Sequence, residues 1–136
     1  KKRFIDHPIY KYIFFSITKN GQIFSLFIAR ILRVKKSKCL RIIDIINLDK
    51  SLKIEFQFLE YMKKNNFEYI DLIYFGSRKK ILTKIGFKEK NNKMILPNYF
   101  EPFFKENITT LIAYLSKKYF EIFKADSDLD RPSKIR

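Results

Sequence analysis

The stretch LRIIDIINLDKSLKIEFQFLEYMKKNNFEYIDLIYF, residues 40–75, decides the fold that we expect for this chain. It begins with an isoleucine-rich run, Leu40 to Ile46, which predicts a buried strand. Apolar residues at helical spacing then predict a helix over residues 51–65, ended by Asn65-Asn66. A second apolar run, Tyr69 to Phe75, predicts another strand. Since strand–helix–strand units are usually right-handed parallel crossovers, we expect these two strands to be parallel.

The expected helix has two faces. Asp49 or Ser51 can cap its N-terminus. Its apolar stripe is predicted to consist of Leu52, Phe56, Leu59 and Met62, widened by Phe58 and Tyr61. The opposite, solvated face is predicted to carry Lys53, Gln57, Glu60 and Lys64.

Two further strands are expected upstream, Tyr10 to Thr18 and Gln22 to Leu32. Asn20-Gly21 between them is a strong signal for a two-residue hairpin turn, in which both central residues have positive φ. A basic turn, Val34 to Lys38, follows. Because both strands are apolar on both faces, we expect other elements to cover both sides of the sheet.

Downstream, Gly76 closes the fourth strand and Ser77 can cap a short helix that runs through Ile85. Gly86 is expected to end this helix in a left-handed turn, and Phe87 to begin a short strand. The prolines and rings of residues 97–109 predict an ordered aromatic loop, residues 110–115 a strand or a helix start, and residues 124–136 a polar tail. The expected fold class is therefore α/β (α+β), one domain over residues 1–136, whose mixed sheet combines an antiparallel hairpin with a parallel unit.

The composition excludes several classes of protein. With 46% apolar residues, 15 Phe and 8 Tyr, the 136 residues can fill a core, so the chain is not expected to be disordered. One Cys and one His exclude an internal disulfide framework and the usual zinc ligand sets. Asp126, Asp128 and Asp130 match only the first half of a calcium-binding loop, so no metal is expected. Neither a membrane span nor a signal peptide is seen, and we expect a cytoplasmic protein.

A formal charge of +15 favours contact with phosphate-rich partners. The lysines are nevertheless scattered, which is typical of a solvated surface. A nucleic-acid or polyanion-binding module stays an alternative, although no platform of exposed rings for base stacking is evident. A homodimer, or a half-domain completed by a partner, is a further alternative.

The element order resembles the central and C-terminal part of the GNAT (Gcn5-related N-acetyltransferase) fold, over roughly residues 10–115. The segment Lys80 to Phe87 is similar to the helix and Gly-Phe ending of that family, and Leu40 to Ile46 lies where the family has its cofactor-binding strand. The family's first strand and first two helices have no counterpart here. Segments 97–103 and 126–132 are similar to uncharacterised acetyltransferase-like proteins of bacterial surface-sugar gene clusters. The resemblance implies an acyl-CoA N-acyltransferase-like domain acting on an amino sugar or a similar small acceptor.

The resemblance implies a cofactor site at the turn after the third strand, with Asn47, Lys50 and Ser51 as candidate acetyl-CoA-binding residues. In the family, glycines in this turn let backbone N–H groups approach the pyrophosphate. This turn contains no glycine, and Asp49 brings a negative charge. We therefore expect acetyl-CoA to bind this chain weakly or not at all.

Two acids inside apolar strands, Asp44 and Asp71, are the candidate catalytic residues. Alternation places Asp44 on the same face as Leu40, Ile42 and Ile46. A buried carboxylate needs a donor, so a structural ion pair with an arginine is the alternative for each acid. The arginines considered are Arg30, Arg33 and Arg41.

The candidate substrate-binding residues are His7, Arg30, Arg41, Tyr99 and Glu101. For His7 the alternative is an ordinary loop residue, and for Tyr99 and Glu101 a loop held on the core by its rings. Cys39 has no histidine nearby in the sequence to activate it and is interpreted as a strand residue.

Overall fold

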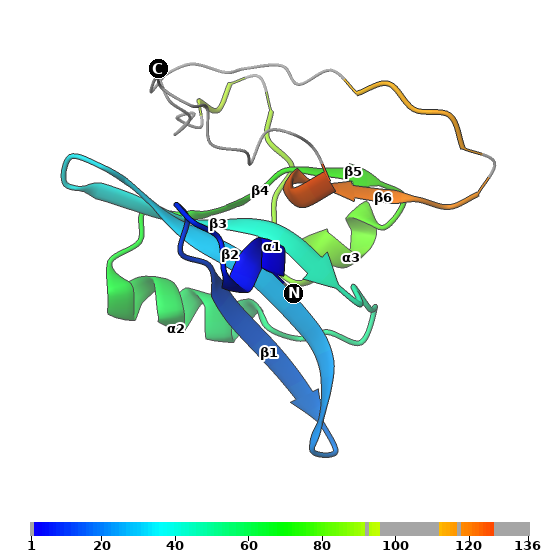
Figure 1. Cartoon of the computed structure of the whole chain (residues 1–136), viewed down its shortest axis with the longest axis horizontal. Helices are drawn as coiled ribbons and strands as arrows, with labels where there is room; N and C mark the ends of the chain where they lie inside the picture. Colours follow the sequence, from blue (N-terminus) through cyan, green and yellow to red (C-terminus); the bar gives the residue numbers. More distant parts are fainter. Residues whose placement is uncertain (1, 92, 96–111, 117, 127–136) are drawn as a thin grey trace.

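A computed structural model describes residues 2–91, 93–95, 112–116 and 118–126. Its main sheet has four strands in the order β1-β2-β3-β4 (Figure 1). They are β1 (Ile13–Lys19), β2 (Gln22–Val34), β3 (Ser37–Ile46) and β4 (Ile70–Leu72). A second, two-stranded sheet pairs β5 (Tyr74–Gly76) with β6 (Glu121–Phe123). The described part of the chain is thus mixed α/β with a mixed sheet, as predicted.

Two tight turns build the antiparallel half of the sheet. Asn20 and Gly21 have φ of 52° and 75°, as expected for the two-residue hairpin between β1 and β2. Lys35, with φ of 54°, lies in the turn between β2 and β3, which also pair antiparallel. Both expected turns are therefore confirmed.

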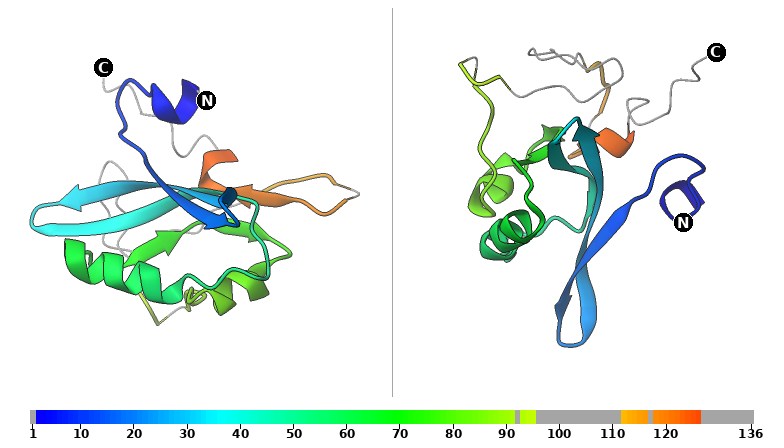
Figure 2. Two further views of the ribbon diagram at one scale, coloured as in Figure 1. Left: turned by 90° about the horizontal axis from the view of Figure 1, so that it is seen from below. Right: turned by 90° about the vertical axis from the view of Figure 1, so that its left-hand side faces the viewer.

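The crossover that decides the fold is confirmed. β3 pairs with β4 in parallel, with Leu40 opposite Ile70, Arg41 opposite Asp71 and Ile42 opposite Leu72. Helix α2 (Glu55–Asn65) connects them, and Asn66 ends it in the left-handed conformation with φ of 52°. Helix α2 and the short helix α3 (Lys79–Lys84) lie on one side of the main sheet, and α1 (Lys2–Ile5) lies on the other (Figure 2).

The core lies between the main sheet and the two helices. It is formed by apolar side chains of β2, β3, the β3–α2 connection and both helices, including Phe27, Leu40, Ile42, Leu48 and Leu82. Phe58 is the ring from α2 that enters this core, in edge-to-face contacts with Phe15 and Phe27 at centroid distances of 6.0 and 5.4 Å.

The predicted apolar stripe of residues 51–65 is confirmed for Leu52, Phe58, Tyr61 and Met62 and wrong for Phe56 and Leu59. The helix begins at Glu55, not at residue 51, and its N-cap residue is Ile54, so neither Asp49 nor Ser51 caps it. Phe56 and Leu59 are 67% and 46% exposed, whereas Phe58 is 9% exposed. Phe58, Tyr61 and Met62 therefore form the packed stripe. The predicted solvated residues Lys53, Gln57, Glu60 and Lys64 are exposed.

Several downstream expectations also differ from the structure. The predicted strand 69–75 is divided at Ile73 between two sheets. Helix α3 has Arg78, not Ser77, at its N-cap. Gly86 has φ of 100°, as expected of a left-handed residue, but residues 87–91 and 93–95 form no strand. Residues 112–115 form neither strand nor helix, and β6 was not predicted at all.

The segment predicted as a polar tail starts inside the fold. Residues 124–126 form the 3₁₀ helix η1, whose Lys124 and Ala125 are buried. η1 and β6 pack against β3, and the Arg3 guanidinium donates a hydrogen bond to the carbonyl oxygen of Ala125. The rest of that segment, and the aromatic loop predicted for 97–109, lie outside the described residues.

Candidate functional site

The main sheet splits where β4 ends. β3 runs on to Ile46 beside β2, but the chain leaves β3 after Leu72 and enters β5, which pairs with β6. Figure 1 shows η1 next to this split, on the side of β6.

The turn after β3 is held together by its own side chains. Asn47, with φ of 59°, donates a 2.6 Å hydrogen bond from Nδ2 to the Phe24 carbonyl oxygen. The Asp49 carboxylate accepts a 2.7 Å hydrogen bond from the Ser51 backbone N–H. Arg78 Nη1 donates to the Leu48 carbonyl oxygen at 2.6 Å.

These contacts make the turn unfavourable for a phosphate group. The hydrogen bonds from Ser51 lower the pKa of Asp49, so its carboxylate is charged at neutral pH. An N–H group that could face a phosphate is therefore already used by an internal anion. Of the three candidate cofactor-binding residues, Asn47 fixes the turn, Ser51 satisfies Asp49, and Lys50 is exposed.

Asp71 forms an ion pair with Arg41, the structural alternative that the sequence left open. Arg41 Nε lies 2.9 Å from Asp71 Oδ1, and Arg41 Nη2 lies 2.5 Å from Asp71 Oδ2. The two residues are directly opposite each other on β3 and β4, and their side chains are 3% and 13% exposed. Burial acts to lower the pKa of Arg41, but the hydrogen bonds and charge of Asp71 outweigh it and raise that pKa. This geometry makes Asp71 a structural partner of Arg41.

Asp44 lies on the other face from the one that alternation predicted. β3 has a bulge, because Ala29 pairs with Ile42 but Ile28 pairs with Asp44, which leaves Ile43 as an extra residue. Asp44 therefore shares a face with Arg41 rather than with Ile42. Burial raises its pKa, and Asp126 adds to this effect, whereas the Ile45 N–H and Arg3 act to lower it.

Asp44 and Asp71 thus lie on the same face of the sheet. Two catalytic residues of one site would have to share a face. The two aspartates do not occupy matching positions, since β4 ends at Leu72 and offers no residue opposite Asp44. Asp71 borders the cavity described below and Asp44 does not.

His7 and Arg30 hold the N-terminal segment in place. His7 Nδ1 accepts hydrogen bonds from the backbone N–H groups of Ile9 and Tyr10, at 3.2 and 2.9 Å, and its ring stacks on Tyr10. The Arg30 guanidinium lies 4.0 Å from the centroid of the Tyr10 ring, a cation–π contact. These contacts match the loop alternative for His7. Tyr99 and Glu101 lie outside the described residues.

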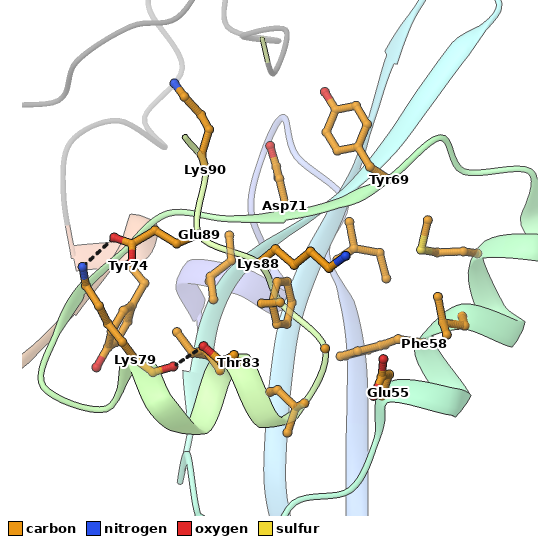
Figure 3. A pocket seen from close by; sticks show the side chains of 18 of the residues that line it. Glu55, Phe58, Tyr69, Asp71, Tyr74, Lys79, Thr83, Lys88, Glu89 and Lys90 are labelled. Carbon is orange, nitrogen blue, oxygen red and sulfur yellow. Dashed lines mark hydrogen bonds and ion pairs between the residues drawn. The ribbon is translucent and has the colours of Figure 1, made fainter. Parts of the chain in front are cut away.

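A cavity of about 450 Å³ lies between α2, α3, β4 and the segment that follows Gly86. Its apolar wall is formed mainly by Phe58, Met62, Leu72, Leu82 and Phe87. The polar residues that border it are Glu55, Tyr69, Asp71, Tyr74, Lys79, Thr83, Lys88, Glu89 and Lys90. Figure 3 shows the side chains of Tyr69, Asp71 and Lys90 directed away from Phe58 and Thr83.

Sequence reasoning missed this cavity. Its wall combines side chains from α2 and β4 with the turn at Gly86, and no local motif marks such a combination. One available signal was Gly86 itself, where a side chain would meet Glu55, since an added Cβ would lie 2.9 Å from Glu55 Cγ. That close approach joins the end of α3 to the start of α2.

Cys39 is fully buried at the start of β3, and its environment predicts an unreactive thiol. Burial and the charge of Asp71 raise its pKa to about 12, although Arg41 and a hydrogen bond with Tyr69 act to lower it. At pH 8 the thiolate fraction should be on the order of 10³-fold smaller than that of an ordinary cysteine with a pKa of about 8.5. We expect an aromatic disulfide reagent to modify Cys39 at least that much more slowly in the native protein than in urea. Fast modification of the native protein would contradict this.

Within the described residues, no group of three or more His, Cys, Asp or Glu side chains is placed to hold a metal ion. None of the helices in the described part of the chain has the length and apolar character that crossing a bilayer requires. Comparisons with protein-family models, curated proteins and solved structures found no match to this chain.

Proposed function

We propose that this chain is a GNAT-like domain, related to acyl-CoA N-acyltransferases but degenerate at the acyl-donor turn. The support for the relationship is architectural. An antiparallel hairpin precedes a parallel β3–α2–β4 crossover, and the strands diverge directly after it. Gly86 and Phe87 follow the short helix α3, and the centroid of the Phe87 ring lies 6.4 Å from that of Phe58.

The single observation that carries the degenerate part of the proposal is the hydrogen bond from the Ser51 N–H to the Asp49 carboxylate. A pyrophosphate at this turn would meet a fixed negative charge instead of a free donor. The domain accordingly works as a binding domain, not as a complete transferase. From the sequence resemblance we propose an amino sugar or a similar small molecule as its acceptor-type ligand, in bacterial surface-polysaccharide metabolism in the cytoplasm.

Calorimetric titration with acetyl-CoA tests the role of Asp49. We expect no saturable binding to the wild-type chain below about 1 mM, which corresponds to about −4 kcal/mol. Replacing Asp49→Gly removes the charge and frees the Ser51 N–H, so this variant should bind at least tenfold more tightly than the wild type. Asp6→Gly changes the net charge equally at an exposed site and should have no such effect.

Two results would count against the proposal. A micromolar dissociation constant for the wild-type chain would show that the turn is competent and the domain is not degenerate. No gain in the Asp49→Gly variant, with far-UV circular dichroism unchanged, would show that this turn is not a vestige of an acyl-CoA site.

A further inference from the structure

The cavity between α2, α3 and β4 is open to solvent on one side and has a largely apolar wall. Apolar surface left beside such a recess is surface that a ligand can cover. Here a cavity of about 450 Å³ adjoins the main core, and core side chains such as Phe58 and Leu82 line it. That volume lies within the usual range of small-molecule sites, about 300–1,000 Å³.

The charges on its wall select for one kind of head group. The Asp71 carboxylate is directed to the other face of the sheet, where it pairs with Arg41, and Glu89 is paired with Lys79 at 2.7 Å. Lys88 makes no hydrogen bond or ion pair with another described residue. Figure 3 shows its side chain extending across the cavity, between Asp71 and Phe58. An ammonium group over an apolar wall is suited to a ligand with one anionic group on an apolar body.

The volume limits the size of that body. An apolar cavity of about 150 Å³ can hold benzene, so about 450 Å³ has room for roughly eighteen carbon atoms when filled completely. Because the cavity is open on one side, an aliphatic chain of roughly ten to fourteen carbons is a better match. Glu55 repels a carboxylate from its own end of the cavity. Lys79 is paired with Glu89 and Figure 3 shows Lys90 directed away from the cavity, so Lys88 is the anchor for the head group.

We propose that this cavity is a binding site for a medium-chain aliphatic carboxylate, with the chain against Phe58, Met62 and Leu82 and the carboxylate on Lys88. The inference does not depend on the acyltransferase relationship, because the cavity lies on the helix side of the sheet and is not formed by the Asn47–Ser51 turn.

Calorimetry with decanoate below its micelle concentration, at pH 7.5, tests the site. We expect saturable binding to one site, with binding of 1-decanol at least tenfold weaker and no binding of decyltrimethylammonium. Lys88→Gln should weaken decanoate binding at least tenfold and leave decanol binding unchanged. Lys84→Gln removes the same charge from an exposed position outside the cavity and should change decanoate affinity less than twofold.

Variants that fill the cavity test whether decanoate binds inside it. Leu59 is 46% exposed and borders the cavity, so Leu59→Trp should abolish the binding of both decanoate and decanol while the protein stays folded. Thr83→Phe, from the exposed side of α3, is a second blocking variant. Decanoate binding that survives both folded variants would place the acid elsewhere on the basic surface and overturn the proposal. So would the absence of saturable binding to the wild-type chain up to about 1 mM.

Discussion

Replacing Asp71 by Asn is expected to lower the free energy of unfolding by about 3–5 kcal/mol, because it leaves the buried Arg41 guanidinium without its counter-ion. Arg41 is 3% exposed, and its Nε and Nη2 both donate to the Asp71 carboxylate. The neutral amide keeps the shape of the side chain but supplies one acceptor oxygen and no charge. Urea unfolding followed by far-UV circular dichroism measures the change.

A double replacement separates the net contribution of the ion pair to the free energy of unfolding from the loss caused by removing one partner alone. Arg41→Met with Asp71→Leu removes both charges, and buried pairs exchanged for apolar residues are often neutral or stabilising. We therefore expect the double variant to be more stable than Asp71→Asn alone. The exposed pair of Lys79 and Glu89 is the control, and Glu89→Gln should change stability by less than about 1 kcal/mol.

The outcome also bears on the role of Asp71. If Asp71→Asn were as stable as the wild type, the carboxylate would not be needed as a counter-ion. That result would favour the interpretation of Asp71 as a catalytic residue over its interpretation as a structural ion-pair partner. A large loss of stability that the apolar double variant restores would identify Asp71 as a structural residue.

Local signals were enough to predict most of the main sheet. Asn20-Gly21 specified the first hairpin because its two positive φ angles fit few other residue pairs. The length of the 51–65 pattern required a crossover, and the parallel pairing of β3 with β4 followed from it. These features depend on residues that are close together in the sequence, so they can be predicted from one sequence.

The features that failed depend on long-range contacts. The bulge at Ile43 reverses the alternation of β3, and only its register with β2 reveals that Asp44 shares a face with Arg41. The break at Ile73 depends on β6, which begins at residue 121, far from β5 in the sequence. For Asp71 the sequence predicted an ion pair with one of three arginines as the alternative to a site role, and the structure shows that the partner is Arg41. The cavity could not be predicted from the sequence.

The phase of α2 illustrates the same limit, since Phe56 and Phe58 both fitted an apolar stripe. The predicted start at residue 51 added a turn that the structure does not have, and this favoured Phe56. The residue that enters the core is decided by where α2 meets the sheet, and Phe15 and Phe27 of the sheet contact Phe58. The difference between the two phenylalanines is therefore a test of the packing itself.

Phe58→Ala is expected to lower the free energy of unfolding by about 3 kcal/mol or more, the usual cost of removing a buried ring. The loss combines the transfer free energy of the ring with its edge-to-face contacts to Phe15, Phe27 and Phe87. Urea unfolding measures the change, with the slope against denaturant as a check that the transition stays two-state.

Phe56→Ala is the matched control, because it removes the same atoms from the same helix. Phe56 is 67% exposed, so this change should stay within about 0.5 kcal/mol, and alanine even has the higher helix propensity. If the two variants had equal effects, or if Phe56→Ala were the more harmful, α2 would face the sheet with the stripe predicted from sequence. The cavity, whose wall includes Phe58, would then have to be lined by other residues, and the carboxylate site inferred from it would fail with it.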